Sequence, residues 1–177
     1  MKFKAALLAA IAVLFSNVAA AGSYYVTAEK TEYKLTTYTT TTSNSSDGDG
    51  NQVRFGFQAN ENFAVEFLYG LDDDLQAGLN TAGQTREGES YYGILLRPGT
   101  QIKSWLRVNA TFGIVRGELF EGSDSFSWGV GIEFMPSSVF SIIGGWTHLA
   151  EEDEGSTGLR VEGLNVGVKF RFGGEDD

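Results

Sequence analysis

The sequence has no cysteine, only two prolines and a single histidine. The absence of cysteine excludes a disulfide scaffold and any site that needs a cysteine ligand or nucleophile. One histidine leaves little for an imidazole-based metal site, and the low proline content together with a charged fraction of 20% argues against wholesale disorder. Basic residues are also scarce, since 13 Lys and Arg stand against 23 Asp and Glu. This balance argues against nucleic acid as a partner, because nucleic-acid-binding surfaces are usually basic.

Glycine and aromatic residues are abundant instead. The 177 residues include 23 Gly, and 13% of the chain is aromatic. The length fits one domain, or at most two small ones. This composition is typical of a β-rich protein, but it does not name a function.

The first residues are typical of a secretory signal peptide. Two lysines precede an apolar run over residues 5–15, and small residues end the segment. The run is too short for an anchor helix, because a bilayer core requires about 20 apolar residues. We therefore predict a signal peptide over residues 1–21, cleaved after Ala20 or Ala21.

Beyond residue 21, apolar and polar side chains alternate with a period of two, which predicts β-strands rather than helices. In one segment, Leu106, Val108 and Ala110 share a face, whereas Arg107 and Asn109 lie on the other. The pattern predicts eight strands, at approximately 23–36, 52–58, 63–70, 90–96, 103–115, 125–134, 139–148 and 160–172.

The connections between these strands alternate between short and long. Three are predicted to be tight turns, at residues 60–62, 97–100 and 135–138. Four are predicted to be long polar loops, at about 37–50, 72–88, 116–123 and 150–158. The two kinds of connection then fall on opposite ends of one antiparallel meander, and closure into a barrel hides its edge strands.

Such a barrel is either soluble with an apolar interior or membrane-bound with an apolar exterior. Apolar and polar side chains alternate along the strands of both kinds, so alternation alone does not distinguish them. Three features favour the membrane: small residues on the polar face, which suit a narrow interior, charges of mixed sign on that face, and aromatic residues near strand ends. We expect these aromatic residues to form interfacial girdles: Tyr69, Tyr91, Trp128, Phe134, Phe140, Trp146 and Phe172.

The polar face predicts a charged lumen. Its charged residues are Arg54, Glu66, Arg107, Glu133, Lys169 and Arg171. Unpaired buried charge is costly, so we interpret them as a paired polar core that plugs the barrel. An eight-stranded interior is just wide enough for side chains, which argues against an open channel. A narrow, switchable ion path is the alternative interpretation of these charges.

The first strand departs from the pattern. Residues 24, 26 and 28 suit a lipid-facing surface, but Lys30, Glu32 and Lys34 continue on the same face. Either the strand leaves the bilayer early or a bulge reverses its alternation, and the sequence leaves both open. The segment 36–46, rich in Thr and Ser, is either an exposed loop or an outward β-extension of the first hairpin.

The last predicted strand ends with a spaced set of polar, glycine, aromatic and phenylalanine residues: Asn165, Gly167, Phe170 and Phe172. This pattern resembles the C-terminal assembly signal of bacterial outer-membrane proteins. Phe172 is followed by five more residues, so the sequence departs from the signal in its distance from the terminus.

Residues 57–70 are similar to the second hairpin of the small outer-membrane β-barrel family, which includes the transmembrane domain of outer membrane protein A and opacity-type proteins. The resemblance implies an all-β fold, an eight-stranded antiparallel up-and-down transmembrane β-barrel. We place it at residues 22–172, followed by an acidic C-terminal tail at 173–177.

The resemblance also implies a location and partners. The protein is expected to be exported through the periplasm to the bacterial outer membrane and to be recognised there by the barrel assembly machinery. Its partners are then outer-membrane lipid and lipopolysaccharide, with short turns facing the periplasm and long loops facing outward. We expect a monomer without a cofactor.

Two features carry weaker candidate chemistry. His148 invites comparison with outer-membrane lipid A hydrolases and acyltransferases, but no serine follows it two residues on, so we interpret it as a rim residue. The acidic runs 72–74 and 151–154 offer carboxylates to hard cations but lack the spacing of a preformed calcium loop. We interpret them as solvated charge, and no catalytic, cofactor-binding or metal-ligating residue is predicted.

The sequence thus favours a non-enzymatic integral outer-membrane barrel with a structural and surface-interaction role through acidic extracellular loops. The first alternative is a narrow porin-like channel for small ions or solutes. Less favoured are a lipid A-modifying enzyme and a soluble periplasmic lipocalin-like binder.

Overall fold

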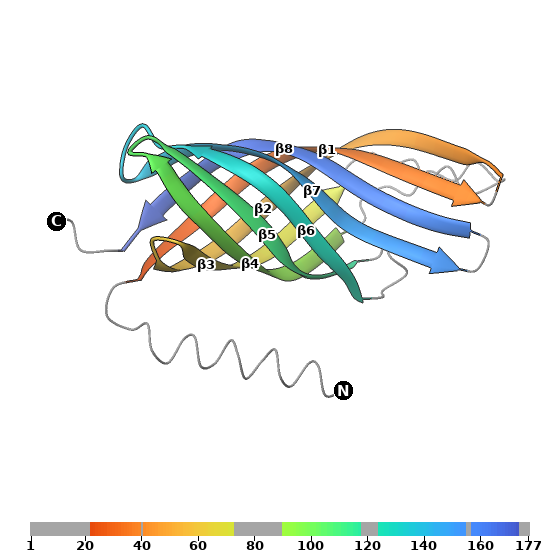
Figure 1. Cartoon of the computed structure of the whole chain (residues 1–177), viewed down its shortest axis with the longest axis horizontal. Helices are drawn as coiled ribbons and strands as arrows, with labels where there is room; N and C mark the ends of the chain where they lie inside the picture. The colour runs from red at the N-terminus through yellow and green to blue at the C-terminus, as the bar shows by residue number, and fades with distance from the viewer. Residues whose placement is uncertain (1–21, 40, 73–89, 118–123, 155–156, 174–177) are drawn as a thin grey trace, which may run out of the picture.

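Eight antiparallel strands close into one barrel (Figure 1). The computed structural model describes residues 22–39, 41–72, 90–117, 124–154 and 157–173. The strands are β1 (Ser23–Thr39), β2 (Ser43–Asn60), β3 (Phe63–Asp72), β4 (Ser90–Lys103), β5 (Leu106–Gly117), β6 (Asp124–Phe134), β7 (Phe140–Glu154) and β8 (Thr157–Phe172). Within these residues, no helix is long and apolar enough to cross a bilayer.

Strand β1 closes the barrel by pairing with both β2 and β8. Its ladder with β8 runs from Tyr24 opposite Phe172 to Thr39 opposite Thr157. The predicted eight-stranded up-and-down barrel is therefore confirmed. Closure gives every strand two neighbours, which removes the open edges that an isolated meander would expose.

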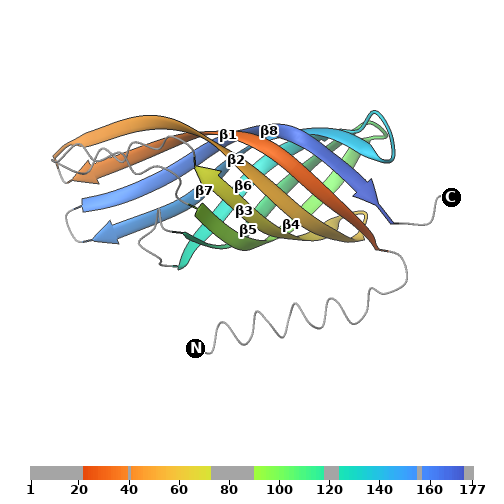
Figure 2. The same cartoon turned by 180° about the vertical axis from the view of Figure 1, so that it is seen from behind.

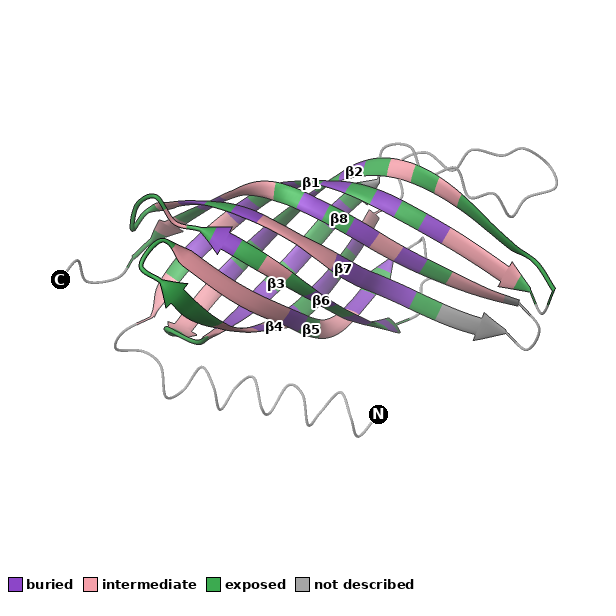
Figure 3. Ribbon diagram, turned by 45° about the horizontal axis from the view of Figure 1, so that its top comes forward, coloured by how far each residue is buried: buried purple, intermediate pink, exposed green. Residues whose placement is uncertain are grey.

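The alternation of the sequence becomes an inside and an outside (Figure 3). In β2, Val53 and Phe55 are about half exposed, whereas Gln52 and Arg54 are buried. Apolar side chains thus cover the exterior and polar ones fill the interior. This distribution is the reverse of that in a soluble barrel and matches a membrane barrel.

Aromatic residues gather on the outer surface at both ends of the barrel. At the short-turn end, Phe172 stacks on Tyr24, with ring centroids 6.3 Å apart. At the other end, Trp128 contacts Trp146 at 4.9 Å. The prediction that Tyr91 belongs to a girdle is wrong, because its side chain is fully buried in the lumen and its neighbour Tyr92 faces outward.

The predicted turn at residues 97–100 is also wrong. Strand β4 continues to Lys103, and the turn to β5 lies at residues 104–105. Its ladder with β5 pairs Leu96 with Phe112, passes over Pro98, and resumes with Gly99 opposite Asn109. Proline removes one backbone donor, but the register on either side of it is unchanged.

Two of the predicted long loops are largely strand. Most of 37–50 belongs to β1 and β2, and most of 150–158 belongs to β7 and β8. The outward β-extension considered for residues 36–46 is therefore correct. Most of the other two predicted loops, 72–88 and 116–123, lies outside the described residues, as does the predicted signal peptide.

The long ends of β2, β1, β8 and β7 form one sheet that projects beyond β3–β6 (Figures 1 and 2). We call this sheet the outer blade. Along β1, Lys30, Glu32 and Lys34 stay exposed while Thr31 and Tyr33 stay buried, and the pairing with β2 shows no register shift. No bulge reverses the alternation of β1. A bulge does occur in β7, between His148 and Ala150, and it turns both Leu149 and Ala150 inward.

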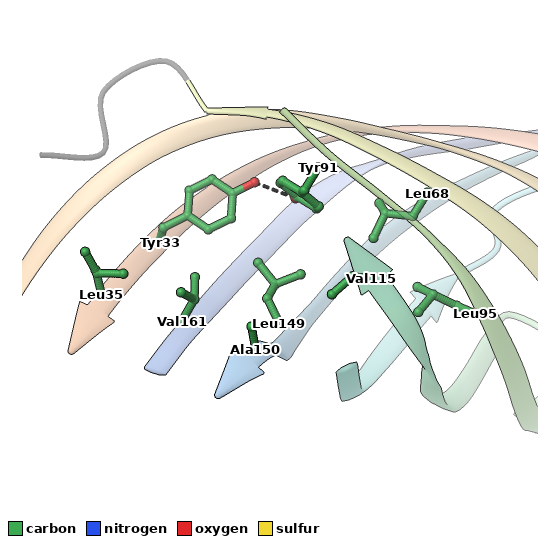
Figure 4. Close-up of a cluster of buried hydrophobic side chains, with 9 residues drawn as sticks. All are labelled: Tyr33, Leu35, Leu68, Tyr91, Leu95, Val115, Leu149, Ala150 and Val161. Atoms are coloured by element: carbon green, nitrogen blue, oxygen red, sulfur yellow. Dashed lines mark hydrogen bonds between the residues drawn. The ribbon is translucent and has the colours of Figure 1, made fainter. Parts of the chain in front are cut away.

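The lumen has two layers. The half toward the outer blade is filled by an apolar cluster (Figure 4), and the half toward the short turns is filled by charged and polar side chains. Within the cluster, the hydroxyls of Tyr33 and Tyr91 hydrogen-bond at 2.6 Å across the lumen. The apolar members are Tyr33, Leu35, Leu68, Tyr91, Leu95, Val115, Leu149, Ala150 and Val161.

Candidate functional site in the lumen

Glu66 is the centre of the charged layer and is fully buried. Its carboxylate accepts hydrogen bonds from the Tyr25 hydroxyl at 2.6 Å, from Arg54 Nη1 at 3.1 Å and from Arg97 Nη1 at 2.8 Å. These three donors come from β1, β2 and β4, so a single carboxylate on β3 joins four strands. Charge-assisted hydrogen bonds of this kind are the strong ones.

A glycine makes this geometry possible. Tyr25 pairs with Gly56 on β2, and Gly56 in turn pairs with Glu66 on β3. A Cβ at Gly56 would collide with the Tyr25 ring. The ring therefore lies across β2 at a position without a side chain and reaches the carboxylate on the strand beyond.

The same arrangement recurs in the apolar half of the lumen. Tyr91 on β4 pairs with Gly70 on β3, and Gly70 pairs with Gln52 on β2. The Tyr91 hydroxyl donates to Gln52 Oε1 at 3.0 Å, and a Cβ at Gly70 would collide with the Tyr91 ring. Interior glycines thus provide room for tyrosine rings that link strands two apart.

Glu133 is the second buried carboxylate that organises the layer. It accepts from Lys169 Nζ at 3.2 Å, lies 3.5 Å from Arg97 Nη2 and forms an ion pair with Arg171. Lys169 Nζ also lies 3.8 Å from the centroid of the Tyr25 ring. Arg97 contacts both Glu133 and Glu66, so it bridges the two halves of the network.

Glu29 completes the buried acids. Arg54 Nε lies 3.0 Å from its carboxylate, and Gln52 and Thr27 each donate to it at 2.8 Å. Glu29 lies on β1 between outward-facing neighbours, so its inward direction follows from the regular alternation of that strand.

The structure brings together five of the six predicted lumen charges, namely Arg54, Glu66, Glu133, Lys169 and Arg171. Arg107 stands apart, because its only described hydrogen bond is a long one of 3.4 Å to the neutral amide oxygen of Gln58. The residues that sequence reasoning missed are Arg97, Glu29 and Tyr25. The sequence predicts a turn at Arg97 because Pro98 follows it. In the structure β4 continues through this position, and Arg97 points inward as Leu95 does two residues earlier.

The predicted assembly-signal residues lie on β8, the strand that closes the barrel. Asn165 is buried and donates to Thr147 Oγ1 at 3.0 Å, whereas Phe170 and Phe172 face outward. Gly167 lies opposite Glu29, and a Cβ there would collide with the backbone of β1. Their reading as a signal stays a prediction.

His148 is buried beside the girdle residues Trp128 and Trp146. Its ring lies 5.8 Å from that of Trp128, and its Nε2 lies 3.8 Å from a Glu151 oxygen. The nearby Ser127 hydroxyl donates to the backbone oxygen of His148 at 3.0 Å, so it does not engage the imidazole. This geometry lacks the nucleophile–base hydrogen bond of a hydrolase.

The acidic run 151–154 begins with a residue that is already paired. Glu151 accepts from Arg160 Nη2 at 2.6 Å and from the Tyr38 hydroxyl at 3.2 Å. The hydrogen bond from Arg160 holds the pKa of Glu151 below its usual value. Within the described part of the chain, no three acidic or histidine side chains gather in a way that could hold a metal ion, and residues 73–74 lie outside it.

The charged layer encloses little free space. A cavity of about 20 Å³ is lined by Glu29, Arg54, Arg97, Asn109 and Asn165, among others. Asn109 Nδ2 and Asn165 Oδ1 are buried there without a hydrogen-bond partner in the protein. This volume fits about one water molecule, so this cavity by itself is too small to carry a continuous aqueous path.

Comparison with known proteins agrees with this architecture. A family model described as "Outer membrane protein beta-barrel domain" matches residues 5–172. A search of curated proteins by sequence gave no match.

Solved structures with the same fold include several outer-membrane barrels. Neisserial surface protein A is 16% identical, with a TM-score of 0.59 over 85% of this chain and 99% of that one. A second structure is that of Ail, the attachment invasion locus protein of Yersinia pestis, in complex with the heparin analogue sucrose octasulfate. Ail is 14% identical, with a TM-score of 0.54 over 86% of this chain and 99% of that one. The N-terminal β-barrel domain of Pseudomonas aeruginosa OprF is 12% identical, with a TM-score of 0.52 over 82% and 97%. At these identities the likeness concerns the fold alone.

Proposed function

The chain belongs to the outer membrane protein β-barrel family, and we propose that it acts there as a surface-interaction protein with a closed lumen. It is an integral protein of the bacterial outer membrane. The orientation with short turns in the periplasm, usual for such barrels, directs the outer blade away from the cell. The outer blade is the observation that carries the proposal.

The outer blade is longer than membrane crossing requires. Strands β1 and β2 have 17 and 18 residues, and β7 and β8 have 15 and 16. A spanning strand needs about 9–11 residues, which is the length of β3 and β6. The surplus strand residues therefore extend beyond the hydrocarbon layer on the extracellular side.

The outer blade is also held in one shape. Tyr33, Leu35 and Val161 pack into the apolar cluster from its inward face. Tyr38 links β1 to β7 through its hydrogen bond to Glu151, and a Cβ at Gly158 between them would collide with the Tyr38 ring. A surface that is ordered before binding loses less conformational entropy when a partner arrives.

The outward face of the blade carries an acidic groove of about 870 Å³. Four carboxylates and one lysine line it, together with Trp146 and Leu164. The charged residues are Glu32, Lys34, Asp47, Asp49 and Glu162. Complementarity favours a partner with basic groups, such as a cationic protein surface. A sulfated ligand like that of the Ail complex is negatively charged, as the groove is, so we do not carry it over to this groove.

Binding of a basic probe to the barrel in lipid nanodiscs tests the proposal. We expect fluorescent poly-lysine to bind the wild-type protein in a salt-sensitive manner and to bind Glu162→Gln more weakly. Glu61→Gln is the matched control, because it removes one carboxylate from the short-turn end of the same barrel. Equal binding by all three proteins would refute a role for the acidic groove.

A narrow channel is the second candidate, supported by the many charges in the lumen. The small cavity in the charged layer and the apolar cluster above it favour a closed barrel. We therefore expect no single-channel steps in planar bilayers. Steps whose size changes in Glu66→Gln would establish the channel instead. The geometry around His148 gives no support to a lipid A-modifying enzyme.

A further inference from the structure

The charges of the described lumen do not balance, and the imbalance is local. Near the middle of the barrel, Glu29 and Glu66 are matched by Arg54 and Arg97. Toward the short turns, Glu133 alone faces three further cations.

These three cations are Lys169, Arg171 and Arg107. The first two form ion pairs with Glu133, and Arg107 is its cross-strand neighbour without an ion pair within 4 Å. The excess of positive charge therefore lies at the periplasmic end of the lumen. Arg107 and Arg171 are half-buried, so water screens their charge only in part and the arrangement favours an anion close by.

A pocket of about 530 Å³ opens at the same end. We call it the inner mouth, and both Arg107 and Arg171 line it. Its polar rim comes from the ends of β2 and β4 and from the β6–β7 turn, and includes Gln58, Gln101, Ser104 and Ser138. Glu61 is the one carboxylate among its lining residues, and it forms no ion pair with either arginine among the described contacts.

Arg107 is the residue with spare binding capacity. A guanidinium has five N–H donors, and the described structure gives Arg107 one hydrogen bond of 3.4 Å to a neutral amide. Arg171 uses Nη1 on the backbone oxygen of Ser138 and Nη2 on Glu133. Two guanidinium groups beside hydroxyl and amide donors form a typical environment for carboxylate or phosphate oxygens.

We propose that the inner mouth is a binding site for an oxyanion, a carboxylate or phosphate group presented from the periplasm, with Arg107 as its principal ligand. The site goes beyond the surface-interaction role, because it lies at the opposite end of the barrel from the outer blade. Two sources offer this chemistry: a free oxyanion, and the carboxylates of Glu175, Asp176 and Asp177 in the chain's own tail. Asp177 is the fifth residue after Phe172, a reach of about 17 Å when the segment is extended.

Calorimetric titration of the refolded barrel in zwitterionic detergent with inorganic phosphate, at constant ionic strength, tests the site. We expect saturable binding to the wild-type protein and about tenfold or greater weakening in Arg107→Gln, because one charge-assisted contact is lost. Arg116→Gln is the matched control, since Arg116 is an arginine of the same strand at the opposite end, paired with Asp124. Heat-modifiable migration of each variant on gels establishes that it is folded.

A tail-neutralised variant, Glu175→Gln/Asp176→Asn/Asp177→Asn, distinguishes the two sources. If the ligand is a free oxyanion, this variant binds phosphate as the wild type does. If the tail occupies the inner mouth, phosphate binds the wild type weakly and the variant at least tenfold more tightly, and Arg107→Gln abolishes the gain. Absence of saturable binding to both proteins, or equal binding by Arg107→Gln and Arg116→Gln, would overturn the proposal. None of these results depends on the acidic groove of the outer blade.

Discussion

Replacing Glu66 by glutamine tests whether the buried charge network holds the barrel together. The substitution keeps the shape of the side chain but removes the charge that compensates Arg54 and Arg97, both buried at 3.1 and 2.8 Å from it. Removing one partner of a buried charge cluster costs about 3–5 kcal/mol, because the remaining charges stay buried without compensation. With a urea slope of about 2 kcal/mol per molar, the unfolding midpoint would fall by about 2 M.

The assay is reversible urea unfolding of the barrel in lipid vesicles, followed by the fluorescence of its tryptophans. Arg116→Gln is the reference variant, because its pair with Asp124 is largely exposed and contributes about 0–1 kcal/mol. Adding Arg97→Gln to Glu66→Gln should restore part of the loss, since the double variant removes a charge of each sign and Glu133 keeps its ion pairs with Lys169 and Arg171. A Glu66→Gln barrel that unfolds within about 0.5 kcal/mol of the wild type would refute the reasoning that the lumen is water-poor and electrostatically coupled.

Two further predictions concern the tyrosines' glycine neighbours and the outer blade. Gly70→Ala should destabilise the barrel by about 1–3 kcal/mol in the same urea assay, because its Cβ would collide with the buried Tyr91 ring. Gly144→Ala, whose nearest described neighbour would be 3.6 Å away, should change stability by less than about 0.5 kcal/mol, and equal effects of the two would contradict the prediction. The pKa of Glu151 is lowered from 4.5 by Arg160, so its contribution is fully present above pH 4.5 and is lost as pH falls through the lowered pKa. An NMR titration should show this pKa rising toward 4.5 in Arg160→Gln, and an unchanged pKa would argue against the pair.

Alternation predicted the barrel well because a membrane barrel must place apolar residues on every second position of each spanning strand. The inward direction of Glu66, Glu133 and Lys169 followed from that constraint. The positions at which the strands end could not be predicted from this alternation. Beyond the bilayer, the outward face of a strand is polar like a loop, so the outer blade has no apolar signal to distinguish it from one.

Other features depended on cross-strand register, which the period of two does not contain. Tyr91 and Tyr92 are adjacent and chemically alike, and the direction of each is set by the glycine opposite Tyr91. Arg97 was missed because Pro98 is a strong turn signal when its strand neighbours are unknown. The apolar cluster of the lumen was not predicted, since Leu149 and Ala150 reach it through a bulge that breaks the alternation of β7.

The two halves of the lumen differ in their access to solvent. The apolar cluster lies between the outer blade and the charged layer, whereas the inner mouth opens beside Arg107 and Arg171 at the short-turn end. In the proposed orientation, with the short turns in the periplasm, we therefore expect protons and ions to reach the buried carboxylates from the periplasmic side. The interior charges would then equilibrate with one compartment, although the barrel contacts two.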